Sequence, residues 1–129
     1  MKINSFKDLE IWQLSIDVVL FVYDLTNKTV FSRDFGLRDQ VRRAVVSIPS
    51  NIAEGFEISN NNDLIRFLRI SKGSLGEVKT QLYISLKLKY ITQAEFNEVN
   101  DRLDVLAVKI GKFISYLTNK KNDKEYKTR

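Results

Sequence analysis

The segment Ser47-Ile-Pro-Ser-Asn-Ile-Ala-Glu-Gly55 places a proline and a glycine inside a stretch that otherwise has helical spacing. A proline in a helix interior costs roughly 3 kcal/mol and leaves one carbonyl without its usual partner. Small and polar residues also stand here where an ordinary core helix carries leucines. We therefore expect packing geometry to determine this segment, with the helix kinked at Pro49 and the chain leaving the helix at Gly55.

Apolar residues recur at helical spacing along most of the chain and predict four helices. They are expected over residues 6–28, 37–56, 63–88 and 92–119. Thr92 and Glu95 form a capping box at the start of the fourth helix. Short connections between long helices indicate an all-α fold, an antiparallel up-down-up-down four-helix bundle over residues 1–119. Residues 120–129 are charged and aperiodic, which predicts a disordered basic tail.

The first predicted helix carries two apolar lines instead of one. One line contains Trp12, Val19 and Tyr23, and the other contains Ile11 and Val18. A helix on the outside of a monomeric bundle needs a single apolar stripe. The second line therefore favours burial against another subunit, and the alternative is a central helix in a compact monomer. The aromatic side chains fit core or interface packing better than a ligand-stacking site.

The composition excludes several classes of function. The chain has no cysteine, which removes disulfides, thiolate metal sites and cysteine nucleophiles. It also has no histidine, which removes the usual general base near neutral pH, imidazole metal ligands and the Arg-x-x-x-x-x-His chemistry of helical RNases of the HEPN type. No targeting segment is visible and no apolar run approaches ~20 residues. We expect a non-enzymatic cytoplasmic protein without cofactor, bound metal or membrane contact.

Basic residues concentrate in the middle of the chain, within a net charge of +5. Residues 33–89 hold ten cations against six carboxylates. One line of the third predicted helix lacks acidic residues and comprises Arg69, Lys72, Gly76, Lys79, Tyr83 and Lys87. Arg38, Arg42 and Arg66 are candidates to extend it. Such a line can follow a phosphate backbone, with Tyr83 stacking on a base, or it can be a solvated helix face.

The two carboxylates Glu54 and Glu77 can be interpreted in two ways. Paired carboxylates can hold a divalent metal for phosphoryl chemistry, which would make the chain a nuclease. The alternative is a structural polar network, which we favour for two reasons. The second predicted helix supplies hydrogen-bond donors at helical spacing, and a buried carboxylate must be paired or hydrogen-bonded. The residues of that network are Arg43, Ser47, Asn51, Glu54 and Glu77.

Four motifs resemble a known family. They are Phe6-Lys-Asp-Leu9 with Trp12, Leu37-Arg-Asp-Gln-Val-Arg-Arg43, the segment from Ser47 to Gly55, and Phe67-Leu68 followed by Gly73-Ser-Leu-Gly-Glu77. Over residues 5–118 the chain resembles the bacterial four-helix-bundle proteins named after the intervening sequences of 23S ribosomal RNA genes. Gly76 departs from the family pattern, which has an acidic or variable residue between Leu75 and Glu77.

The resemblance implies a ring-shaped homopentamer. It also implies kinship with the accessory subunit of diversity-generating retroelements, a basic ring that binds a reverse transcriptase and nucleic acid. The expected function is a homo-oligomeric scaffold that binds nucleic acid, structured RNA first, or a nucleoprotein complex. The expected partners are other copies of the chain, RNA or DNA, and a nucleic-acid-handling protein. The alternative is a protein–protein interaction module that binds no nucleic acid.

Overall fold

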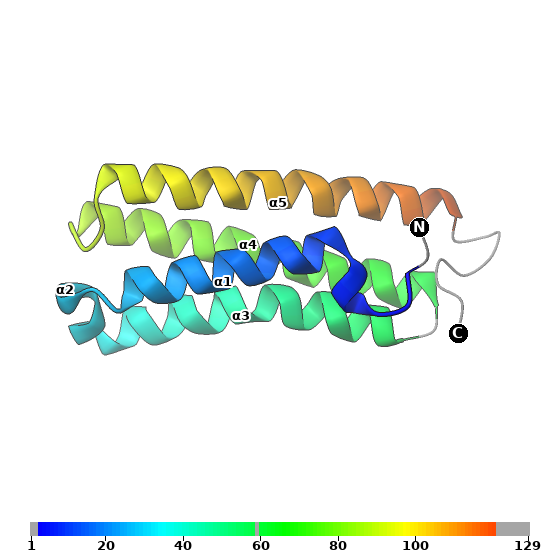
Figure 1. Ribbon diagram of the computed structural model, residues 1–129, viewed down its shortest axis with the longest axis horizontal. Helices are drawn as coiled ribbons and strands as arrows, with labels where there is room; N and C mark the ends of the chain where they lie inside the picture. Colours follow the sequence, from blue (N-terminus) through cyan, green and yellow to red (C-terminus); the bar gives the residue numbers. More distant parts are fainter. Residues whose placement is uncertain (1–2, 59, 121–129) are drawn as a thin grey trace.

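The computed structural model describes residues 3–58 and 60–120. A short 3-10 helix η1 (Phe6–Asp8) precedes five α-helices: α1 (Glu10–Thr26), α2 (Thr29–Arg33), α3 (Phe35–Glu57), α4 (Asn61–Lys87) and α5 (Gln93–Lys120). The four long helices run antiparallel side by side (Figure 1), as predicted. The predicted tail lies outside the described residues, except that Lys120 is the last residue of α5.

Around the bundle, α3 and α5 each pack against both α1 and α4. The helices α1 and α4 therefore occupy diagonal corners. The core lies between the four helices and contains the regularly spaced positions that periodicity predicts, for example Leu64, Leu68, Leu103, Leu106 and Ile110, none of which is exposed.

The start of the first helix differs from the prediction. Asp8 accepts hydrogen bonds from the backbone N–H of Asn4 (3.0 Å) and of Ser5 (3.1 Å), and the Ser5 hydroxyl accepts one from Lys7 N (3.2 Å). This capping box closes η1 as a separate turn. Leu9 then adopts an extended conformation, so α1 begins only at Glu10.

The connection between the first two predicted helices contains a helix, α2, that periodicity does not reveal. Phe31 is its only buried residue and is completely enclosed. Its ring lies 5.4 Å from that of Tyr90 in the α4–α5 connection. The Tyr90 hydroxyl donates a 2.9 Å hydrogen bond to Asp34, which also caps α3. One aromatic anchor therefore holds the two connections at this end of the bundle together.

The apolar line of α1 that contains Trp12, Val19 and Tyr23 is partly covered within a single chain. Trp12, Val19 and Tyr23 are half-buried and pack against the same core as Ile11 and Val18. The compact-monomer explanation therefore accounts for much of this line. Leu20, which interrupts the polar face of α1, is 60% exposed.

Helix α3 continues through Pro49 from Phe35 to Glu57. Pro49 has no N–H to donate to the preceding turn. Side chains bond carbonyls beside it: the Ser71 hydroxyl of α4 donates to Ile48 O (2.9 Å), and the Asn51 amide donates to Ser47 O (2.8 Å). These bonds connect the turn around Pro49 to its own helix and to α4. The kink predicted at Pro49 stays a prediction.

Candidate nucleic-acid interface

The predicted basic line of α4 runs along the edge that faces α5. The ammonium group of Lys72 lies 3.5 Å from the position that a Cβ on Gly111 would take. Further along, the Tyr83 ring meets Phe96 of α5 edge-on, with ring centres 6.2 Å apart. The line is therefore the border of the α4–α5 seam.

The cations of this line differ in how far their charge is already compensated. Lys79 forms an ion pair with Asp104 of α5. The Lys87 ammonium group lies 5.3 Å above the ring of Tyr83, which is itself 52% exposed. Within the described part of the chain, the exposed Arg69 and Lys72 have no carboxylate partner. These two side chains are the best candidates for contacts to an external anion.

The three arginines that were expected to extend this line divide between two places. Arg66 lies on α4, 3.6 Å from Asp63. Arg42 instead faces α1, where it donates to Thr26 and Asn27 (both 2.8 Å).

Arg38 also lies away from the α4 edge. It donates to Asp39 (2.9 Å) and to the carbonyl of Ser32 in α2 (3.2 Å). Arg38 and Arg42 therefore hold the turn between α1 and α3 and do not continue the basic line of α4.

Part of the predicted polar network is present between α3 and α4. The Asn51 amide donates to the Ser47 hydroxyl (2.9 Å), which is 2.8 Å from the hydroxyl of Ser74 in α4. The prediction missed Ser74 as a member of the network, although its spacing from Ser71 places both on the face toward α3. These serines allow the two helices to approach closely.

The charged residues predicted for the network do not join it. Arg43, Glu54 and Glu77 are exposed. Within residues 3–58 and 60–120 none of the three makes a hydrogen bond or ion pair. Arg43 and Glu77 line opposite walls of an open surface pocket of about 470 Å³, together with Gln40 and Ser47. The expectation of buried carboxylates was wrong, because this edge of the α3–α4 seam is open to solvent.

Two titratable groups outside this interface are shifted by local bonds. The Lys28 ammonium group, 2.6 Å from Glu95, and the backbone N–H of Thr92 lower the pKa of Glu95 from its ordinary value. The hydrogen bond to Asp34, with desolvation, raises the pKa of Tyr90. Both groups support the connections at one end of the bundle.

The described residues contain no cluster of three or more Asp or Glu side chains placed to hold a metal ion. Among the same residues, no helix is long and apolar enough to cross a membrane. The functional groups that the structure places at this interface are exposed cations on α4 and polar side chains along the α3–α4 seam.

Comparison with known proteins places the chain in a family. A family model described as 23S rRNA-intervening sequence protein matches residues 7–112. The fold is similar to that of a protein of unknown function from the S23 ribosomal protein family of Bacteroides thetaiotaomicron, with a TM-score of 0.75 and 21% identity over 81% of this chain and 97% of that chain. No curated protein matches. Because the family model spans well over half of the sequence, the chain belongs to the 23S rRNA-intervening sequence protein family.

Proposed function

We propose that this chain is a non-enzymatic cytoplasmic scaffold that assembles as a homo-oligomer, a pentamer by its family resemblance, and binds nucleic acid. Structured RNA is the first candidate. The observation that carries the proposal is the outward side of α4, where the unpaired cations Arg69 and Lys72 stand beside two open glycines, Gly73 and Gly76.

The two glycines supply the steric part of the argument. Glycine in a helix interior costs roughly 1 kcal/mol relative to alanine. A Cβ added at Gly73 or at Gly76 would meet no atom within 4 Å, so packing within one chain does not require glycine at either position. Because neither position has a side chain, a phosphate backbone or another helix could approach α4 closely there.

The cations supply the electrostatic part. Each lysine or arginine that neutralises a phosphate releases condensed counterions and strengthens binding at low salt. Two unpaired cations per subunit give weak binding alone. Repetition of the same edge in a homo-oligomer adds avidity, provided that one RNA spans several subunits.

The test is RNA binding by the double variant Arg69→Gln/Lys72→Gln across a salt series. We expect affinity to fall by about tenfold or more and the slope of log K against log salt to become shallower by about 1.5–2, since two phosphate contacts are lost. A matched control is Arg102→Gln/Lys109→Gln, which removes two cations of α5 that are paired with Glu98 of α5 and Glu10 of α1. Unchanged retention of RNA by the α4 variant would contradict the proposal.

A protein–protein interaction module is the second candidate, favoured by apolar side chains on the outer side of α4. Ile70 and Ile84 are each 42% exposed. This function predicts assembly without salt-sensitive RNA binding. The non-enzymatic part has its own test: metal-dependent RNA cleavage by the wild type that Glu77→Gln abolishes would contradict it.

A further inference from the structure

The charges of the bundle are divided between diagonal corners. Helix α1 contains Glu10, Asp17 and Asp24 and no lysine or arginine. Helix α4 contains five cations and only two carboxylates, Asp63 and Glu77. Because α1 and α4 each pack against α3 and α5, their charges lie on opposite sides of the molecule. We call the corner formed by α1 the acidic side and the corner formed by α4 the basic side.

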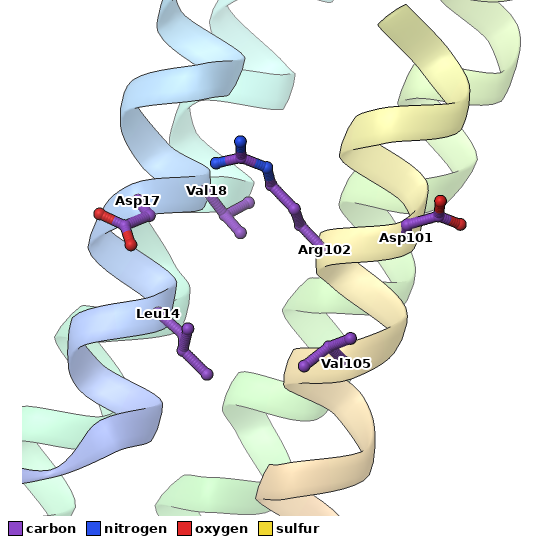
Figure 2. Close-up of a pocket in the computed structure, with 6 residues that line it drawn as sticks. All are labelled: Leu14, Asp17, Val18, Asp101, Arg102 and Val105. Carbon is purple, nitrogen blue, oxygen red and sulfur yellow. The ribbon is translucent and has the colours of Figure 1, made fainter. Parts of the chain in front are cut away.

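The acidic side carries an apolar groove between α1 and α5. Leu14 and Val18 reach into it from α1 and Val105 from α5, as Figure 2 shows. Arg102 of α5 also lines the groove, and its guanidinium group lies 4.9 Å above the ring of Phe21 and 3.7 Å from Glu98. The groove has a volume of about 300 Å³. Asp17 and Asp101 stand on its two rims with their carboxylates turned outward (Figure 2).

One face of α4 carries two exposed isoleucines on the basic side, and we call this face the outer stripe of α4. It is defined by residues on one helix face and consists of Arg66, Ile70, Gly73, Glu77 and Ile84. Ile70 and Lys72 are two residues apart, which separates them by about 160° around the helix. The outer stripe is therefore distinct from the part of the basic edge that contains Lys72, and Arg69, about 60° around the helix from both Arg66 and Lys72, lies between the two surfaces.

We propose that the outer stripe of α4 of one copy docks into the α1–α5 groove of the next copy. This proposal rests on the self-association proposed above and names the two surfaces that make it. Ile70 would enter the apolar groove, and Gly73, close to it on the same face of α4, would let the neighbouring helix come near the backbone. The cations at the N-terminal part of α4, Arg66 and Arg69, would face the carboxylates of Asp17 and Asp24.

Charge also selects the type of interface. A two-fold contact of α4 on α4, or of α1 on α1, would bring like charges together, which costs several kcal/mol. Contact between the acidic side of one copy and the basic side of another avoids this repulsion. Such a heterologous, head-to-tail contact repeats from copy to copy and closes into a ring when its rotation allows.

The test reverses each side separately and then both together. The groove-side variant is Asp17→Lys/Asp24→Lys, at two exposed residues whose side chains make no hydrogen bond or ion pair in the described part of the chain. The stripe-side variant is Arg66→Glu/Arg69→Glu. The fourfold variant carries all four changes. Lys112→Glu/Lys120→Glu on α5 is the control for charge reversal elsewhere, and light scattering after size exclusion of RNA-free protein measures the assembly.

We expect each double variant to weaken association by about tenfold or more, and the fourfold variant to regain it because the attraction is restored with opposite signs. An equimolar mixture of the two double variants should form mixed complexes, whereas the control should assemble like the wild type. Circular dichroism checks that every variant is helical.

Two results would overturn the inference in distinguishable ways. If the wild type assembles and both double variants assemble equally well, these two surfaces do not make the contact, while the scaffold proposal stands. If the wild type stays a monomer at high concentration, both this docking and the homo-oligomeric scaffold are wrong. Loss of RNA binding by the stripe-side variant with assembly intact would assign the cations to RNA and overturn the docking.

Discussion

Gly55, at the end of the proline-containing segment, is a point where α3 and α4 approach closely, and its replacement by alanine tests this packing directly. A Cβ at Gly55 would lie 2.7 Å from Cβ of Phe67 and 3.1 Å from a methyl carbon of Leu64. Carbon atoms pack best at about 3.5–4.0 Å. Because Cβ of Phe67 is fixed to the backbone, the clash cannot be relieved by side-chain rotation, and the two helices must move apart.

The magnitude follows from two opposing terms. Overpacking of a well-packed core costs about 1–3 kcal/mol. Alanine recovers about 1 kcal/mol of helix propensity relative to glycine. We therefore expect Gly55→Ala to lower the free energy of unfolding by about 0–2 kcal/mol, which shifts the midpoint of urea unfolding by up to roughly 1 M at the usual m-value of a small domain.

The matched control is Gly73→Ala, also in a helix interior. Nothing lies within 4 Å of a Cβ there, so the same change should raise the free energy of unfolding by about 0.5–1 kcal/mol at low protein concentration. If Gly55→Ala were as stable as Gly73→Ala, the close approach of α3 and α4 at Gly55 would be refuted.

Two further predictions concern single bonds. Ser71→Ala removes the buried hydrogen bond to Ile48 O and should lower the free energy of unfolding by about 1–2 kcal/mol. The same change at Ser32, whose hydrogen bond to Thr29 O is solvent-exposed, should alter it by less than about 0.5 kcal/mol; equal effects in urea unfolding would contradict this. The pKa of Glu95 is lower in the folded than in the unfolded chain because of Lys28, so its ionised form stabilises the fold above the ordinary pKa and the effect disappears as the pH falls through the folded-state pKa. The difference in melting temperature between wild type and Glu95→Gln should be full near pH 7, correspond to about 0.2–1 kcal/mol, and shrink as the pH falls below the ordinary pKa of a glutamate and through the lowered folded-state pKa; a difference independent of pH would contradict it.

Long-range periodicity and local capping chemistry were sufficient to predict the four long helices. The fourth helix shows why: Thr92 and Glu95 bond each other's backbone within four residues (2.8 and 3.1 Å), so the signal is contained in the local sequence. The separate turn η1 has a similar signature, Ser5 followed by Asp8, but the apolar spacing of its residues continues that of α1 and hides the break at Leu9.

Features that depend on how helices are rotated against each other could not be predicted. Arg42 has the sequence character of a residue in a basic patch, yet the rotation of α3 turns it toward α1. Ser47 and Asn51 were predicted together because four residues separate them on one helix. Their partner Ser74 depends on the register of α3 against α4, which a single sequence does not contain.

The same limit explains the failure of the buried-carboxylate prediction. Glu54 and Glu77 lie on helical faces that carry polar residues, but whether such a face is enclosed depends on the spacing between the helices. In the structure both side chains are exposed, and Glu77 faces Arg43 across an open pocket. Sequence spacing identifies which residues share a face and leaves the enclosure of that face undetermined.

The most direct test of the proposed function is native mass spectrometry of the purified protein, freed of nucleic acid and then mixed with a structured RNA. The account predicts one discrete homo-oligomer, five copies by the family resemblance, which binds the RNA as an intact assembly and releases it as ionic strength is raised. A well-folded monomer at every concentration tested, with no RNA-bound species, would contradict it.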